Sequence, residues 1–174
     1  MSTTPRVASA VDGRPADFRS ALAHTPAVAA AFHRLYGTMW SEGIVSQALK
    51  ETARMRNARV TDCGFCKNVR FDGARAAGLT EDQVAQIDDG FETSTLSADQ
   101  KLVLRWTDAM LHDPAHVDPV LRTAMAARFE PAEIVELSLA VALFLGMSKV
   151  LISLGMEPEA MSTTVLPTPA LARA

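Results

Sequence analysis

Apolar side chains recur three and four positions apart along most of the chain, which is the spacing of one face of an α-helix. The pattern predicts helices over residues 16–23, 27–40, 44–60, 63–77, 81–87, 98–113 and 132–154, and one more that begins at Asp118 and Pro119. No stretch alternates between apolar and polar residues as a half-buried strand would. The sequence therefore predicts an all-α fold.

Both ends of the chain lack this helical pattern. Residues 1–15 are rich in Ser, Thr, Pro and Gly, and residues 157–174 contain three prolines. Such composition is typical of termini that are poorly ordered. We therefore expect a flexible N-terminal arm over residues 1–15, a single helical domain over residues 16–156 and a flexible C-terminal tail over residues 157–174.

The segment over residues 132–154 is apolar nearly all round. A helix of this kind is expected at the centre of a domain or at a subunit interface. Only 12 uncharged residues separate Glu136 from Lys149, whereas a membrane-spanning helix needs about 20. We therefore expect this helix to belong to the folded domain and not to a membrane.

Charge and composition narrow the classes of function. The chain of 174 residues carries 17 Lys and Arg against 20 Asp and Glu, a net charge of −3, with no basic run. Nucleic acid is therefore not an expected partner. The N-terminus lacks the apolar run of a secretory signal, so we expect a cytoplasmic protein. Cysteines in a reducing cytosol are expected to cycle between the thiol and disulfide states rather than to form a permanent crosslink.

The most specific chemical signal is the pair Cys63 and Cys66 in the order Cys-Gly-Phe-Cys. If Asp62 caps a helix here, both sulfurs lie in or near its first turn, where unpaired N–H groups favour a thiolate. Arg70 is four residues beyond Cys66, so on a continuous helix it would lie on the same face one turn later. This arrangement predicts a redox-active dithiol.

Two other interpretations of the cysteines remain open at this stage. They can be small buried apolar residues with a purely structural role. A zinc half-site is less favoured, because there is no second cysteine pair and the four histidines lie far from this segment. His112 and His116 have the spacing of a helical metal pair, but Pro114 between them breaks the helix they would need. We expect neither a metal nor a cofactor.

Glu51, Cys63 and Cys66 together resemble the carboxymuconolactone decarboxylase superfamily, particularly its AhpD-like alkylhydroperoxidase branch. The family motif is a Glu near the end of one helix, eleven intervening residues, and a Cys-x-x-Cys that opens the next helix, as in this chain. Residues 129–136 also resemble the family's entry into its last long helix. The resemblance covers roughly residues 27–156 and implies an AhpD-like helical bundle of about six to eight helices.

The resemblance also implies roles for the motif residues. In the peroxidase branch the second cysteine attacks peroxide and the first resolves it, which assigns these roles to Cys66 and Cys63. Glu51 would be the carboxylate of the family's proton relay. The family's His is replaced by Arg70, which cannot act as a base because a guanidinium keeps its proton. Arg70 can instead hold a thiolate, pair with Glu51, or bind a carboxylate or peroxide oxygen.

We therefore expect a thiol-dependent peroxidase or disulfide reductase whose oxidised state is a Cys63–Cys66 disulfide. A small hydroperoxide would be the substrate and a dithiol protein the reductant, and the family suggests a homo-oligomer, a trimer or hexamer. One alternative is a cofactor-free lyase, isomerase or cyclase, with Glu51 as acid or base and Arg70 holding the carboxylate of an organic acid. The other is a non-catalytic member of the fold.

Overall fold

A computed structural model gives the fold, and it describes residues 4–158 and 160–170. The elements, in chain order, are α1 (Phe18–Leu22), α2 (Pro26–Ser41), α3 (Gln47–Val60), α4 (Gly64–Asn68), β1 (Val69–Phe71), α5 (Asp72–Ala76), α6 (Glu81–Ala85), η1 (Phe91–Thr93), α7 (Ala98–His112), η2 (Pro114–His116), α8 (Pro119–Arg128), α9 (Pro131–Ser153) and β2 (Thr164–Leu166). The predicted all-α domain is confirmed. The described chain has nine α-helices, slightly more than the six to eight expected, because one predicted helix is divided.

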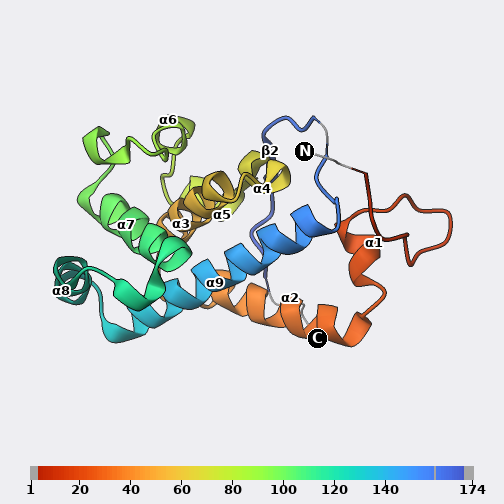
Figure 1. The fold of residues 1–174 in the computed structure, drawn as a ribbon, viewed down its shortest axis with the longest axis horizontal. Coiled ribbons are helices and arrows are strands. Elements are labelled where there is room, and N and C mark those ends of the chain that lie inside the picture. The colour runs from red at the N-terminus through yellow and green to blue at the C-terminus, as the bar shows by residue number, and fades with distance from the viewer. Residues whose placement is uncertain (1–3, 159, 171–174) are drawn as a thin grey trace.

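The last long helix, α9, is the centre of the domain. Figure 1 shows it crossing the middle of the molecule, and it contacts α2, α3, α7 and α8. Pro131 occupies its first turn, and a capping box joins Glu130 and Glu133. Among the described helices, α9 alone is long and apolar enough to cross a membrane, a criterion that a core helix also meets. Its packing confirms the predicted central position.

The helix α3 is polar in sequence, yet most of its residues are buried. Its buried charged side chains are held in ion pairs, which are Glu51–Arg54 within the helix, Lys50–Glu136 to α9 and Arg56–Asp108 to α7. A charge is tolerated in a protein interior chiefly when it is paired and hydrogen-bonded. These pairs therefore allow α3 to pass between α7 and α9 and to bring polar groups to the middle of the fold.

The helix predicted over residues 63–77 is wrong as a continuous element. It is divided into α4, the three-residue strand β1 and α5. Peptide groups that a continuous helix would pair internally have other partners here: the Val69 carbonyl accepts from Arg54, and the Phe71 N–H donates to Glu51. Tertiary hydrogen bonds thus override the local helical pattern at residues 69–71.

Residues beyond α9 pack against the domain, whereas the sequence predicted a flexible tail from residue 157. The strand β2 pairs in parallel with β1, with Val69, Arg70 and Phe71 opposite Thr164, Val165 and Leu166. Thr168 then donates two hydrogen bonds to Asp72, from its N–H at 2.8 Å and its hydroxyl at 2.7 Å. Three-residue strands are too short to show alternation, so the sequence pattern did not reveal this pairing.

The described part of the N-terminal arm is irregular but also makes contacts with the domain. The N–H of Arg6 donates to the Leu154 carbonyl at 2.9 Å, and its guanidinium donates to the Ser153 carbonyl at 2.8 Å. The N-terminal arm therefore packs against the end of α9, whereas the C-terminal segment packs against β1 and α5. Figure 1 shows both segments in the half of the molecule that holds α1 and β2.

Candidate active site

The two cysteines lie directly after α3, where a tight turn ends that helix. Asp62 has a left-handed backbone with φ 54°, the N–H of Cys63 donates to the Ala58 carbonyl at 3.0 Å, and the N–H of Asp62 donates to the Arg59 carbonyl at 3.1 Å. These two bonds are the Schellman pattern that commonly closes a helix. Asp62 was expected to cap the next helix, but that position is taken by Cys63.

The two sulfurs are in contact. Both cysteines are free thiols, with Cys63 buried and Cys66 partly exposed. The Cys63 thiol donates a hydrogen bond to Cys66 Sγ at 2.7 Å, and Cys63 Sγ accepts from the Cys66 N–H at 3.3 Å. The two sulfurs therefore meet at the start of α4. Little movement would bring them to the geometry of a disulfide.

The surroundings make Cys66 the thiolate of the pair. The hydrogen bond from Cys63, the hydroxyl of Ser148 and the positive charge of Arg54 together outweigh burial and lower the pKa of Cys66 to about 7. Donating to Cys66 and being buried raise the pKa of Cys63 far above that of an ordinary thiol. At neutral pH the pair therefore combines a nucleophilic Cys66 with a protonated Cys63.

Ser148 and Asn57 form a second layer of contacts to Cys66. The Ser148 hydroxyl, from α9, donates to Cys66 Sγ at 3.5 Å, and the Asn57 amide, from α3, donates to Ser148 Oγ at 2.9 Å. Both side chains are buried, at 0% and 1% exposure. The chain of bonds from Asn57 through Ser148 thus ends at the sulfur of Cys66.

Glu51 lies in the core as the partner of Arg54. Its carboxylate accepts from Arg54 Nε at 2.7 Å and from Nη2 at 2.6 Å, and also from the Phe71 N–H at 3.3 Å. Burial opposes the positive charge of Arg54, but the Glu51 carboxylate raises the pKa of the guanidinium above its ordinary value. Glu51 does not line the cavity described below. Its role as a proton relay remains a prediction.

The guanidinium beside Cys66 belongs to Arg54 and not to Arg70. Arg54 donates to the Cys66 carbonyl at 2.9 Å and thereby fixes the backbone of the cysteine. Arg70 lies on β1, where α4 has already ended, so the expected helical spacing to Cys66 does not apply. Its Nε donates to Glu81 at 3.1 Å, and its Nη1 donates to the Lys67 carbonyl at 2.7 Å. The prediction that Arg70 faces Cys66 is therefore wrong.

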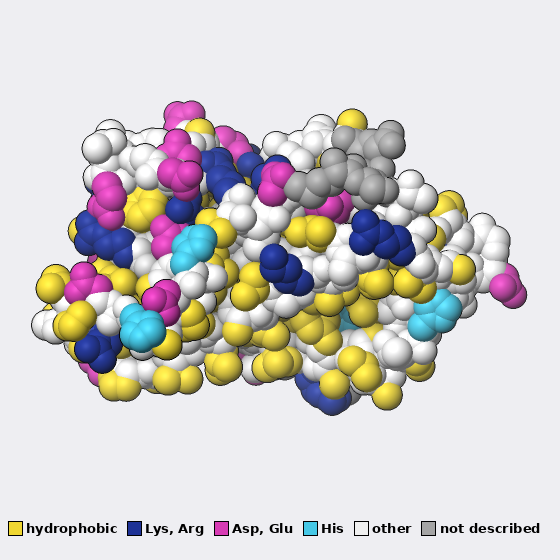
Figure 2. Space-filling view, viewed as in Figure 1, with side chains coloured by type: hydrophobic (Ala, Val, Ile, Leu, Met, Phe, Trp, Pro, Cys, Tyr) yellow, Lys and Arg dark blue, Asp and Glu magenta, His cyan; other side chains and the backbone are white. Residues whose placement is uncertain are grey.

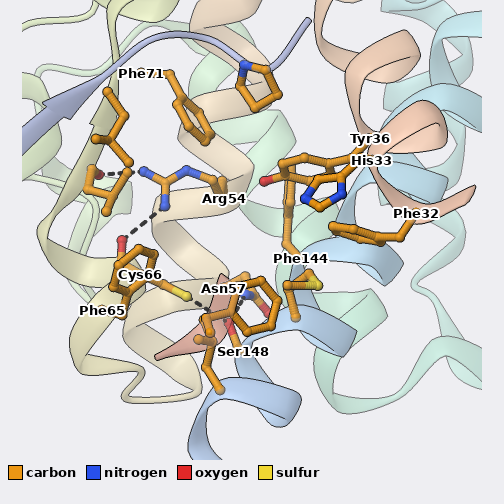
Figure 3. Close-up of a pocket in the computed structure, with 16 residues that line it drawn as sticks. Phe32, His33, Tyr36, Arg54, Asn57, Phe65, Cys66, Phe71, Phe144 and Ser148 are labelled. Atoms are coloured by element: carbon orange, nitrogen blue, oxygen red, sulfur yellow. Dashed lines mark hydrogen bonds between the residues drawn. The ribbon is translucent and has the colours of Figure 1, made fainter. Parts of the chain in front are cut away.

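A cavity of about 230 Å³ opens beside Cys66. Figure 3 shows Cys66, Asn57 and Ser148 gathered at one end of this cavity, with Tyr36, His33 and Phe32 of α2 at the other. Most of the remaining wall is aromatic or aliphatic, from Phe18, Phe65, Val69, Phe71, Phe144, Met147, Leu151, Leu166 and Pro169. Arg54 also lines the cavity. Burial raises the pKa of Tyr36 to about 12.

The sequence predicted Cys63, Cys66 and Glu51 as site residues. It did not reveal Arg54, Asn57 and Ser148, which surround Cys66 in the structure. Arg54 follows Glu51 by three residues, a helical ion-pair spacing that could have been noticed. Ser148 is a polar residue near the end of an apolar helix, which is a weaker signal. Nothing in the sequence alone places it beside a cysteine 82 residues earlier.

Comparisons with known proteins match part of this chain to a known family. Residues 26–87 match the carboxymuconolactone decarboxylase family. The match contains Glu51, both cysteines, Arg54 and Asn57, and it confirms the resemblance found in the sequence. An uncharacterized protein of Mycobacterium tuberculosis is 33% identical over 108 residues, which are 62% of this chain. The chain spans 37% of that relative's length.

Two solved structures share the fold of this chain. A protein of unknown function from Agrobacterium tumefaciens, whose suggested role is that of the antioxidant defence protein AhpD, superposes with a TM-score of 0.65. It is 16% identical, and the match covers 84% of this chain and 94% of that one. An uncharacterized peroxidase-related protein from a Silicibacter species gives a TM-score of 0.71 at 16% identity, covering 90% and 95%. These neighbours establish the AhpD-like helical fold.

Proposed function

We propose that the protein is a thiol-dependent peroxidase that reduces organic hydroperoxides through Cys66 and Cys63. The observation that carries this proposal is the pair of contacting free thiols at the end of an apolar cavity, one with a lowered pKa and one with a raised pKa. A thiolate that is stable near neutral pH is the form that attacks an O–O bond.

The proposed reaction has two steps within the protein. The Cys66 thiolate attacks the terminal oxygen of the hydroperoxide, the O–O bond breaks, and the alkoxide leaves with the electron pair and takes a proton from water. The Cys63 thiol then attacks the sulfenic acid on Cys66, which forms the disulfide and releases water. The hydroperoxide is reduced to an alcohol, and the two thiols are oxidised.

Regeneration of the thiols requires an external dithiol, which we propose is a small reductant protein. Its thiolate would attack the partly exposed Cys66, since Cys63 is fully buried. The aromatic wall of the cavity favours a hydroperoxide with an apolar organic group, because burial of that group against Phe65, Phe71 and Phe144 contributes to binding.

The geometry favours this chemistry over the cofactor-free lyase, isomerase or cyclase. That alternative needs Glu51 as an accessible acid or base and Arg70 as the group that holds a substrate carboxylate. Glu51 is 1% exposed and bound to Arg54, and Arg70 is bound to Glu81 and to main-chain carbonyls. Neither residue lines the cavity beside Cys66.

A single-turnover experiment tests the proposal. The reduced protein is mixed with a stoichiometric amount of cumene hydroperoxide, and free thiols, alcohol product and protein mass are followed together. We expect loss of two thiols for each alcohol formed and a mass decrease of two hydrogens. Cys66→Ser should be unreactive, whereas Cys63→Ser should form one alcohol and stop at a sulfenic acid that dimedone traps. Two thiols that persist in excess peroxide would exclude the peroxidase and leave the non-catalytic alternative.

A further inference from the structure

One buried polar atom at the cavity has no partner. Asn57 Oδ1 accepts no hydrogen bond from any residue that the structure describes, although Asn57 is only 1% exposed. Such an acceptor loses its contacts with water and gains nothing in return, so buried polar atoms are rarely left unpaired. Asn57 lines the cavity together with Cys66 and Ser148. The unpaired oxygen therefore marks a place where a ligand can donate a hydrogen bond.

The orientation of the Asn57 amide follows from its neighbours. The single hydroxyl proton of Ser148 is directed to Cys66 Sγ, so Ser148 Oγ can only accept from Asn57. The NH2 group of Asn57 must then face Ser148, as it does at 2.9 Å, and the carbonyl oxygen is left for another donor. The same contacts that stabilise the thiolate thus leave the carbonyl oxygen of Asn57, a residue that lines the cavity, without a donor among the described residues.

We propose that Asn57 Oδ1 accepts a hydrogen bond from the O–H group of the hydroperoxide and holds its terminal oxygen against Cys66 Sγ. This inference rests on the proposed function and adds a substrate-contacting residue to it. The terminal oxygen is the atom that the thiolate must attack, and the proton on it is the only donor that every hydroperoxide shares. Asn57 therefore recognises the reacting group, while the aromatic wall binds the organic group.

The same contact serves the intermediate. After the O–O bond breaks and the S–O bond forms, the former terminal oxygen is the hydroxyl of the sulfenic acid on Cys66, and it still carries its proton. That hydroxyl can continue to donate to Asn57 Oδ1. It is thereby held in place while Cys63 attacks Cys66 Sγ and water leaves.

The test compares two thiol reagents. Cumene hydroperoxide carries the O–H donor, whereas methyl methanethiosulfonate reacts with thiolates and has no hydrogen-bond donor. Both second-order rate constants are measured on the reduced protein, above the Cys66 pKa of each variant, so that the thiolate fraction is the same. Their ratio, peroxide over thiosulfonate, removes changes in the intrinsic reactivity of the sulfur.

We expect Asn57→Leu to lower this ratio by roughly five- to tenfold, the effect of one lost neutral hydrogen bond. Met147→Leu is the matched control, because it changes an apolar side chain of the same cavity wall and leaves the bonds of Asn57 and Ser148 in place. Its ratio should equal that of the parent protein. Asn57→Ala replaces Asn57→Leu if the larger side chain prevents folding, and circular dichroism checks each variant.

The outcomes separate this inference from the function on which it rests. An unchanged ratio in the Asn57 variants, with a parent protein that reacts with the hydroperoxide, would overturn the role of Asn57 and leave the peroxidase standing. A ratio that falls equally in Met147→Leu would assign the effect to disturbed packing of the cavity wall and also overturn it. A parent protein that reacts with the thiosulfonate but not with the hydroperoxide would reject both.

Discussion

The positively charged residue that matters for the dithiol lies before the cysteines and not after them. Arg54 joins the Glu51 carboxylate to the backbone of Cys66 and Val69, so one guanidinium connects three parts of the site. Arg70, which the sequence suggested, instead binds Glu81 and the main-chain carbonyls of Lys67 and Val69. The two arginines therefore differ in their effect on Cys66, although both are mostly buried.

Replacement of Arg54 and replacement of Arg70 should differ in their effects on the free energy of unfolding and on the labelling of Cys66. Arg54→Met should destabilise the fold by about 3–5 kcal/mol, because it leaves the Glu51 charge buried and unpaired. It should also move the midpoint of iodoacetamide labelling of Cys66 to higher pH. Arg70→Met is the matched control: its pair with half-exposed Glu81 is worth up to about 1 kcal/mol, and the labelling profile should not change. Urea denaturation measures the stability of each variant. Equal shifts of the labelling midpoint in both variants would contradict the conclusion that Arg54, and not Arg70, stabilises the Cys66 thiolate.

The ionisation of Cys66 also links stability to pH. Its pKa in the folded protein is lowered to about 7, whereas an unfolded thiol has a pKa of about 8.5. A lowered pKa contributes stability that is present above the unfolded value and is lost as the pH falls through the folded value. The raised pKa of Cys63 acts oppositely, above the range of interest.

We therefore expect the reduced protein to gain about 1–2 kcal/mol of unfolding free energy relative to Cys66→Ser between roughly pH 6.5 and 8.5. The variant lacks the ionisation but retains the other titrating groups. Urea denaturation of both proteins over this range, with a reductant present, measures the difference. If the plots of unfolding free energy against pH stay parallel for the two proteins, the Cys66 thiolate is not stabilised by folding.

At the scale of elements, the helices followed from the sequence, whereas the division of one helix did not. Periodicity and helix-opening residues located α2, α3, α7 and α9 to within a few residues, because each is long and begins at a capping side chain or at a proline. Residues 69–71 have the same local pattern but pair with a strand about a hundred residues later. Such a contact is determined by packing across the fold, and no local pattern in the sequence reports it.

The pairing of β1 with β2 should depend on Thr168. Thr168 Oγ1 accepts from the Gly73 N–H at 2.8 Å and donates to Asp72, which fastens the C-terminal segment just beyond β2. Thr168→Val keeps the shape but removes these bonds. We expect amide exchange of residues 69–71 to become roughly tenfold faster, about the effect of one hydrogen bond. Thr164→Val is the control, since within residues 4–158 and 160–170 the Thr164 hydroxyl bonds to the carbonyl of nearby Ser162 alone. Equal exchange in both variants would contradict the role of Thr168.

At the scale of the molecule, α2 and α9 leave large apolar side chains exposed on a shared surface. Figure 2 shows apolar side chains gathered along the lower part of the view, where these helices lie in Figure 1. Leu35, Val135 and Leu139 line a groove there and are 53%, 59% and 58% exposed. Exposed apolar patches commonly mark contacts between subunits. We propose that a second copy of the chain covers this surface, in line with the homo-oligomer that the family resemblance implies.

Light scattering after size-exclusion chromatography checks this expectation. The parent protein should elute with the mass of an oligomer, and Leu139→Asp should shift the mass toward that of one chain, because a carboxylate would be buried without a partner. Val120→Asp is the matched control, since Val120 is 75% exposed on α8, away from this groove. A parent protein with the mass of one chain, or equal masses in both variants, would reject the proposed contact.

The parallel strand pair has a consequence for synthesis of the chain. β1 and β2 are separated by 95 positions, from residue 69 to residue 164, and Leu166 and Pro169 complete the cavity wall. Translation proceeds from the N-terminus, and contacts between distant residues form late. The cysteines therefore leave the ribosome long before the wall that shelters them. A nascent chain therefore carries accessible thiols whose pKa is still ordinary, because Ser148, which helps to lower the pKa of Cys66, is added 82 residues later.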